Sequence, residues 1–405
     1  MRPASPVTGT RITRTGTVGT GTVGTGTGGT GTGGTGITGA AAAGAGLSGE
    51  TAEAARRIER WLLSGGAQIE EGAQRGAVAG RLDPEGRPEF VYLEITGYYL
   101  TSMAWLASGA ASSPDRAAEA RAHGRQALDW ISRSLAERGV PPTRLYVSGA
   151  PSDWRNAGVF TFDLAMAARG AATFGQVTGY EAWKEPAAGL CTAIDGMTSG
   201  SAVLRSHDAV ARAPLPDRWS TRPGPHHLKA AAALLRIPDG VLGAPLARVC
   251  RRTCAHWEAV LGETWPCREV HPLLYGIEGL LIGAPSANDE ALEAVERLYA
   301  RLMRLQAADG TLTETTGGGL VRSDVLAQAL RIGRVLRGRG RLQGDGWAGR
   351  LGDLTRALLG FVRADGGVRF SRDQEAVNTW CAMFAHQALL AGQGGLTEAV
   401  SELLV

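Results

Sequence analysis

The sequence predicts an all-α fold, because helical segments of two kinds alternate along most of the chain. From residue 49 onward, segments rich in Ala, Leu and Arg carry apolar residues at helical spacing and are separated by loops rich in Gly and Pro. Some segments, such as DRAAEARAHGRQALDWISRSLAERG, have one apolar stripe and a charged face. Others, such as GVFTFDLAMAARGAATFG, are apolar on almost all sides. The first kind is typical of outer helices and the second of helices enclosed by their neighbours.

We expect twelve helices in six pairs, with an outer helix followed by an inner helix in each pair. The expected ranges, in chain order, are 49–66, 92–109, 115–138, 160–178, 180–198, 225–236, 245–262, 271–284, 289–308, 321–336, 346–364 and 376–393.

An internal repeat indicates that the pairs are arranged regularly. The stretches LQAADGTLTETTGGGLVRSDVLAQAL and FVRADGGVRFSRDQEAVNTWCAMFAHQAL both run from an outer helix through Ala-Asp-Gly to a polar cluster at the start of an inner helix. Asp309 and Arg322 are as far apart in sequence as Asp365 and Asn378. A unit that recurs about every 50 residues predicts an array or a closed ring rather than an irregular bundle.

Twelve alternating helices in pairs resemble the (α/α)6 toroid, in which six helical hairpins form two concentric rings. Many glycosidases, polysaccharide lyases and sugar epimerases share that fold, as do triterpene cyclases, prenyltransferases and lanthionine cyclases. The resemblance covers residues 49–405 and concerns the fold alone. In QAADGTL, Gln306 and Asp309-Gly310 look like the Gln-x-x-Asp-Gly-x-Trp repeat of terpene cyclases, but Leu312 stands where Trp is expected. The Asp-rich motif of those cyclases and the Cys and Cys-His zinc motifs of lanthionine cyclases are absent, which disfavours both families.

Residues 1–48 form a Gly/Thr-rich segment of low complexity without a single acidic residue. Such a composition predicts a disordered tail, followed by one toroid domain over residues 49–405. The tail has no apolar run typical of a secretion signal, and no run in the chain is long enough to span a membrane. Together with an odd number of cysteines, this favours reduced thiols and a cytoplasmic protein.

The charge distribution excludes some partners. The tail arginines Arg2, Arg11 and Arg14 account for the formal net charge of +3, so the rest of the chain is neutral. Without a basic stripe, we expect neither nucleic acid nor membrane as a partner, and the oligomeric state stays open. We expect no cofactor and no metal. A structural zinc site is the alternative to buried thiols for three cysteines, Cys250, Cys254 and Cys267.

Polar residues recur at the start of all six expected inner helices, which read YLEITGYY, VFTFDLAM, GPHHLKAA, VHPLLYGIEG, LVRSDVLAQ and VNTWCAMF. In toroids of this kind, these ends and the loops before them line the central pocket. We expect catalytic roles for Glu94, Tyr98, His271 and Asp324. We expect substrate contacts from Asp163, His226, His227, Lys229, Tyr275, Arg322, Asn378 and Trp380, and from Trp154 and Arg155 in the loop GAPSDWRNAGVF.

Structural roles are the alternative for several of these residues. Three positions also suit helix N-caps, namely Asp163, Asp324 and Asn378. Glu94 and Arg322 would alternatively form an ion pair across the ring. Lys229, one of only two lysines in the chain, indicates contact with an anion. Glu278, two turns beyond His271 on the same helix face, would orient that histidine.

The residue types suit acid–base chemistry on a polar and anionic substrate. Glycoside hydrolysis needs two opposed carboxyl groups, which Glu94 with Asp324 or Asp163 would supply. Elimination or epimerisation of a uronic acid needs a His or Tyr base, with Asn, Arg or Lys to neutralise the enolate. The candidate residues include a His or Tyr base together with Asn, Arg and Lys. They therefore meet the needs of elimination or epimerisation more completely than those of hydrolysis. We therefore expect a carbohydrate lyase, epimerase or glycoside hydrolase, with proton transfer favoured.

Two functions of other classes stay open. One is tailoring of a peptide or other natural product by a cyclase, dehydratase or epimerase type of reaction. The other is non-catalytic binding, in which the polar ring holds a ligand as a scaffold. The ligand would be a small molecule, an oligosaccharide or a peptide in each case.

Overall fold

A computed structural model describes residues 37–147, 153–209, 215–283, 289–391 and 404 of the chain. The chain divides into two units between Gly44 and Ala45, and the fold below is that of the unit from Ala45 onward. Helix α1 (Ile37–Ser64) begins inside the segment expected to be disordered, and residues 1–36 of that segment lie outside the described part. The predicted boundary at residue 48 therefore stays a prediction.

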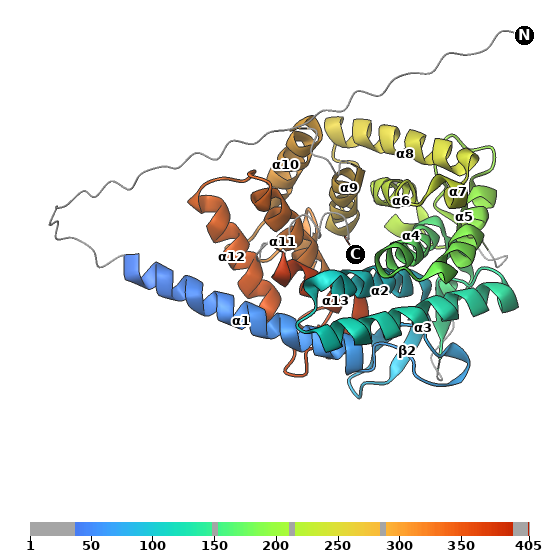
Figure 1. Cartoon of the computed structure of the whole chain (residues 1–405). Coiled ribbons are helices and arrows are strands. Elements are labelled where there is room, and N and C mark those ends of the chain that lie inside the picture. Colours follow the sequence, from blue (N-terminus) through green and yellow to red (C-terminus); the bar gives the residue numbers. More distant parts are fainter. Residues whose placement is uncertain (1–36, 148–152, 210–214, 284–288, 392–403, 405) are drawn as a thin grey trace, which may run out of the picture. The chain divides into compact units, whose positions relative to one another are not determined.

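Six helices form a closed inner ring, as predicted. Each packs against the next inner helix along the chain, and the last packs against the first. Figure 1 shows them around the centre of this unit, with the other long helices outside. The inner helices are α2 (Leu93–Trp105), α4 (Thr161–Thr178), α6 (His226–Leu234), α9 (Val270–Gly283), α11 (Ser323–Gly338) and α13 (Thr379–Leu390).

The outer helices cover this ring with their apolar stripes. In α3, for example, Leu128, Trp130 and Ile131 are buried while most of the charged residues stay accessible. Besides α1, the outer helices are α3 (Pro114–Arg138), α5 (Lys184–Thr198), α8 (Ala244–Glu263), α10 (Asp289–Met303) and α12 (Asp345–Leu359). Within the described ranges, the short helix α7 (Asp239–Leu242) is the one addition to the twelve predicted helices. No helix there is both long and apolar enough to cross a bilayer.

Glycines allow two inner helices to pack with their backbones in contact. A Cβ atom at Gly97 in α2 would lie 2.6 Å from backbone atoms of Met166 and Ala167 in α4. A Cβ atom at Gly170 would lie 2.1 Å from the carbonyl oxygen of Gly97. Only glycine permits this approach, which explains the high glycine content of the apolar segments.

Short strands lead into several inner helices, and the sequence analysis did not anticipate them. Strand β2 (Pro88–Tyr92) runs directly into α2, β4 (Gly158–Phe160) into α4 and β8 (Val377–Asn378) into α13. The sheets have the orders β3-β2-β1-β8, β4-β5 and β6-β7. The remaining strands are β1 (Ala79–Leu82), β3 (Arg144–Tyr146), β5 (His207–Ala209), β6 (Thr313–Thr315) and β7 (Gly318–Val321). The first of these sheets connects the starts of α2 and α13, because it contains both β2 and β8.

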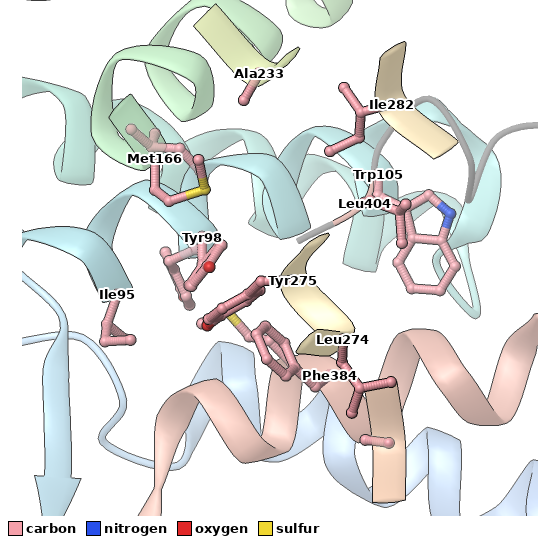
Figure 2. Packing of buried hydrophobic residues seen from close by; sticks show 14 of the residues in the cluster. Ile95, Tyr98, Trp105, Met166, Ala233, Leu274, Tyr275, Ile282, Phe384 and Leu404 are labelled. Carbon is pink, nitrogen blue, oxygen red and sulfur yellow. The ribbon is translucent and has the colours of Figure 1, made fainter. Parts of the chain in front are cut away.

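Aromatic side chains fill the centre of the inner ring. Figure 2 shows Tyr98, Tyr275 and Phe384 close together, and the rings of Tyr98 and Phe384 meet edge to face at 5.3 Å between centroids. An aromatic pair of this kind contributes about 0.5–1.5 kcal/mol beyond the area it buries. The centre of the ring is therefore a packed core, above which polar groups gather at the N-terminal ends of the inner helices.

Candidate active site

A cavity of about 1000 Å³ lies at the N-terminal ends of the inner helices. Its wall includes residues at the start of each inner helix and from the strands that precede them. Ten of the fourteen residues predicted from the sequence line it, namely Glu94, Trp154, Arg155, Asp163, His226, His271, Tyr275, Arg322, Asn378 and Trp380. The ring thus brings residues from both ends of the domain into one site.

The other four predicted residues lie behind the cavity wall and do not line it. They are Tyr98, His227, Lys229 and Asp324, each at most 2% exposed. Tyr98 and Asp324 therefore do not reach the surface of the cavity, although their expected catalytic roles need contact with a ligand there. The anion that Lys229 contacts belongs to the protein, since its Nζ donates to Glu278 Oε2 at 2.9 Å.

Asp324 forms an ion pair with Arg322, so the alternative pair between Arg322 and Glu94 is not formed. Arg322 Nη2 lies 2.6 Å from Asp324 Oδ2, and Trp380 Nε1 donates to the same oxygen at 3.1 Å. Burial alone would raise the pKa of Asp324, but the positive charge of Arg322 lowers it to about 2. Asp324 is thus a permanent carboxylate that holds Arg322 and Trp380 in place at the cavity wall.

The N-cap alternative explains little of the polar pattern. The cap positions of α4 and α11 are taken by Phe160 and Arg322, so neither Asp163 nor Asp324 is a cap. Asn378 does occupy the cap position of α13, but its side chain makes no capping hydrogen bond.

Glu94 and Asp163 form a carboxyl pair in the cavity wall, at the starts of two neighbouring inner helices. Their side chains share a hydrogen bond, and Thr143 Oγ1 donates to Asp163 Oδ2 at 2.7 Å. Burial raises the pKa of Asp163 well above its ordinary value, and the negative charge of Glu94 raises it further. Burial also raises the pKa of Glu94. Because two carboxyl groups in contact disfavour a second ionisation, the pair favours the state with one proton, in which one group is an acid and the other a base.

His271 and this pair are both neighbours of Tyr275. The hydroxyl of Tyr275 is 3.5 Å from Glu94 Oε1, and its ring centroid is 4.3 Å from that of His271. Burial lowers the pKa of His271 to about 4, although the nearby carboxylate of Asp324 opposes this shift. Its imidazole is therefore neutral at pH 7. Since Nδ1 is held by Gln328 Oε1 at 2.6 Å, Nε2 is the nitrogen left to act on a ligand.

Arg144 is a half-buried arginine of the cavity wall that forms no ion pair with the described acidic residues. Four other lining arginines are paired with acids: Arg81 with Glu89, Arg155 with Asp153, Arg222 with Asp217 and Arg322 with Asp324. In the described part of the chain, no acid lies within ion-pair distance of Arg144, nor of the exposed Arg218. The guanidinium of Arg144 lies 4.0 Å from the ring centroid of Phe90 and 5.5 Å from that of Tyr92. A stacked guanidinium held in this way suits a planar carboxylate.

Aromatic rings make up much of the remaining wall. The indole of Trp219 lies edge-on to His226 and His271, with centroids 5.2 and 5.7 Å away. The guanidinium of Arg155 lies 4.3 Å from the ring centroid of Trp154. Flat apolar surfaces beside charged groups suit a ring-shaped polar ligand.

Three residues of the site were not recognised in the sequence. Gln328 stood out only as a lone amide one turn after Asp324 on an apolar helix. Arg144 and Trp219 lie in a short strand and a short turn, where no periodic pattern distinguishes a lining residue from an exposed one. The position of Arg144 depends on the pairing of β3 with the distant strand β2, which a single sequence does not reveal.

The described residues contain no group of three or more His, Cys, Asp or Glu side chains arranged to hold a metal ion. The three cysteines considered for zinc are free thiols. Burial raises the pKa of Cys254 and of Cys267 to about 12, which opposes the thiolate form that zinc requires.

No protein-family model and no curated protein matches this sequence. Solved structures do match the fold. A sugar epimerase from a ruminal bacterium is 11% identical, with a TM-score of 0.61 over 83% of this chain and 98% of the epimerase. A D-mannose isomerase is 11% identical, with a TM-score of 0.61 over 84% of this chain and 96% of the isomerase. An unsaturated glucuronyl hydrolase specific for heparin is 12% identical, with a TM-score of 0.59 over 85% of this chain and 96% of the hydrolase. The chain therefore has the predicted (α/α)6 toroid fold.

Proposed function

We propose that the protein is a carbohydrate-active enzyme that moves a proton at the carbon atom next to the carboxylate of an acidic sugar. One observation carries the proposal: a neutral histidine and a pair of buried carboxyl groups both lie next to Tyr275 in the same cavity. The names of the toroids with similar folds, a sugar epimerase, a mannose isomerase and a glucuronyl hydrolase, support a sugar as the substrate.

The proposed reaction begins with proton removal by His271. Its Nε2 takes the proton from the carbon, and the electron pair of the broken C–H bond moves into the carboxylate to form an enolate. Arg144 neutralises the charge that develops on the carboxylate oxygens. In epimerisation, the Glu94–Asp163 pair returns a proton to the opposite face of the carbon. In elimination, the enolate expels the oxygen on the next carbon, and the pair protonates that oxygen.

Arg144 supports an acidic rather than a neutral sugar. It is close enough for its charge to act on Asp163, so a carboxylate bound to it would lie beside the carboxyl pair. A neutral sugar would leave this guanidinium without a counter-charge once the ligand had displaced water from the cavity.

Hydrolysis is less well supported by the same geometry. Glycosidases use two carboxyl groups roughly 5–9.5 Å apart on opposite sides of the bond that is cleaved. Glu94 and Asp163 share a hydrogen bond and are closer than that, and Asp324 is buried against Arg322 outside the cavity. Of the carboxyl groups predicted for catalysis, no two are therefore placed as a glycosidase requires.

Incorporation of solvent deuterium tests the proposal directly. The protein is incubated in D2O with a panel of hexuronates, with oligosaccharides that end in them and with the matching neutral sugars. Exchange at carbon is followed by NMR and mass spectrometry. We expect deuterium next to the carboxylate of at least one acidic sugar if the reaction is epimerisation, or an unsaturated uronate if it is elimination, and loss of either outcome in His271→Asn.

The matched control is His256→Asn, because His256 is exposed on the outer helix α8. This variant should exchange deuterium as the wild type does. Cleavage of an oligosaccharide that gives neither exchange at carbon nor an unsaturated uronate would contradict the proposal and indicate a hydrolase. Binding of an acidic sugar with neither exchange nor cleavage would contradict it in favour of a non-catalytic binder.

A further inference from the structure

A buried network of hydrogen bonds lies behind His271. The side chain of Gln328 bridges His271 and Glu278, with Oε1 2.6 Å from His271 Nδ1 and Nε2 3.2 Å from Glu278 Oε2. Glu278 also accepts from Lys229 Nζ at 2.9 Å and from Arg331 Nε at 2.9 Å. His271 is 5% exposed, and the other four residues are at most 1% exposed. Water therefore has little access to any of these groups.

The charges of the network determine which way the amide of Gln328 points. Burial alone would raise the pKa of Glu278, but the positive charges of Arg331 and Lys229 hold it below its ordinary value, so this carboxylate is ionised. An ionised carboxylate can only accept hydrogen bonds. Gln328 must therefore turn its NH2 group toward Glu278, which leaves its carbonyl oxygen facing His271.

The orientation of Gln328 in turn determines where the proton of His271 lies. A carbonyl oxygen can only accept a hydrogen bond, so Nδ1 of His271 must carry the hydrogen that Gln328 Oε1 receives. In a neutral imidazole the other nitrogen then has a free lone pair. The opposite tautomer would set two lone pairs against each other at 2.6 Å and place a hydrogen on Nε2.

We propose that Gln328 is a positioning residue that holds His271 in the Nδ1–H tautomer, with Glu278 as the fixed group that orients the amide. The consequence for catalysis rests on the proposed function, because only a base at Nε2 needs this tautomer. The tautomer itself does not depend on any reaction. Arg322 and Asp324 are the other charged groups that face His271, and Asp324 Oδ2 lies 3.9 Å from Nδ1. Asp324 is therefore the rival group for holding the same hydrogen.

Long-range ¹H–¹⁵N NMR of the full-length protein with ¹⁵N-labelled histidine measures the tautomer. The signals of His271 are identified by their loss in His271→Asn. We expect a protonated Nδ1 and an unprotonated Nε2 between pH 6 and 8 in the wild type, and a substantial fraction of the Nε2–H form in Gln328→Leu. A wild-type histidine with the hydrogen on Nε2 would overturn the proposal. An unchanged Nδ1–H form in Gln328→Leu would also overturn it, since Asp324 would then hold the hydrogen.

Gln387→Leu is the matched control. Gln387 is another fully buried amide of the same network, and its Oε1 accepts from Arg331 Nη1 at 3.0 Å. Its replacement should leave the His271 tautomer unchanged, and an equal change in both variants would refute a specific role for Gln328. If Gln328→Leu does not fold, Gln328→Asn provides the same test, because its shorter amide cannot reach both partners.

A kinetic measurement separates this inference from the proposed function. With deuterium exchange as the assay, Gln328→Leu should lower kcat about 10- to 100-fold with KM little changed. A loss of this size is typical when the hydrogen-bond partner that orients a functional histidine is removed. A fall in kcat of less than about threefold in a variant whose tautomer has changed would refute the catalytic part. If the wild type neither exchanges a sugar proton nor forms an unsaturated uronate, the proposed function fails, while the NMR result still decides the role of Gln328.

Discussion

Replacement of Glu278 by glutamine should destabilise the protein by roughly 3–5 kcal/mol, because it leaves two buried cations without their anion. Glu278 is fully buried between Lys229 and Arg331, whose side chains are 1% and 0% exposed. Burial lowers the pKa of Lys229 to about 8, against the attraction of Glu278. Without that carboxylate the pKa of Lys229 falls further, and its side chain loses its proton at pH 7. Arg331 cannot lose its proton, so its charge remains in the core.

Thermal unfolding followed by circular dichroism measures this loss. Unfolding entropy of about 2.1 cal/mol/K per residue gives roughly 0.8 kcal/mol/K for a unit of ~360 residues, so the Tm should fall by about 4–7 °C. The control is Glu53→Gln, which removes a half-exposed carboxylate paired with Arg56 at 2.9 Å. Solvent screens such a pair, and the Tm should stay the same. A Tm for Glu278→Gln within about 1 °C of the wild type would refute the view that this carboxylate balances the buried cations.

Three further predictions concern the cavity. Because burial lowers the pKa of His271 to about 4, kcat/KM for exchange should rise with pH through about pH 4 and then level off; a rise centred near pH 6.5 would show an ordinary histidine. Arg144→Met should raise KM for the acidic sugar about 10- to 100-fold, since a charge-assisted hydrogen bond contributes about 1.5–3 kcal/mol, with no effect on binding of a neutral sugar. Burial opposes ionisation of Asp324, but the positive charge of Arg322 lowers the pKa of its carboxyl group to about 2. The ionised carboxylate therefore stabilises the fold by about 2 kcal/mol above pH ~4, and this stabilisation is lost as the pH falls to 2. In urea unfolding, the stability gap between wild type and Asp324→Asn should therefore narrow from pH 5 to pH 3, and a constant gap would contradict this account.

The helices could be predicted because each kind of helix has its own apolar pattern. A segment such as α3 buries one stripe, and a segment such as α4 is buried on all sides, so both the order and the two-ring arrangement follow from periodicity. The strands escaped prediction because they are two to five residues long, and some of them pair with distant segments. Strand β1, for example, pairs with Asn378 and Val377, which lie almost a domain away in sequence.

The candidate site could be predicted as a set of positions but not as a set of contacts. The polar residues at the starts of the inner helices do meet in one cavity, because the toroid brings those ends together. It was harder to predict whether a side chain reaches the cavity or lies behind its wall, since one helical turn separates a lining residue from a buried one. His226 lines the cavity, whereas Lys229, three positions further on, lies behind the wall and pairs with Glu278.

Glu94 shows how much the identity of a partner changes the chemistry. An acidic residue on an apolar helix needs a partner, and the partner suggested by the sequence was Arg322 across the ring rather than Asp163 on the next inner helix. An ion pair with Arg322 would have left a permanent carboxylate with no proton to give. The contact with Asp163 instead leaves one proton shared by two buried acids, which is the state a proton-transfer enzyme needs beside a neutral base. The preference for proton transfer over hydrolysis therefore depends on which two inner helices are neighbours, α2 and α4, more than on which residues they carry.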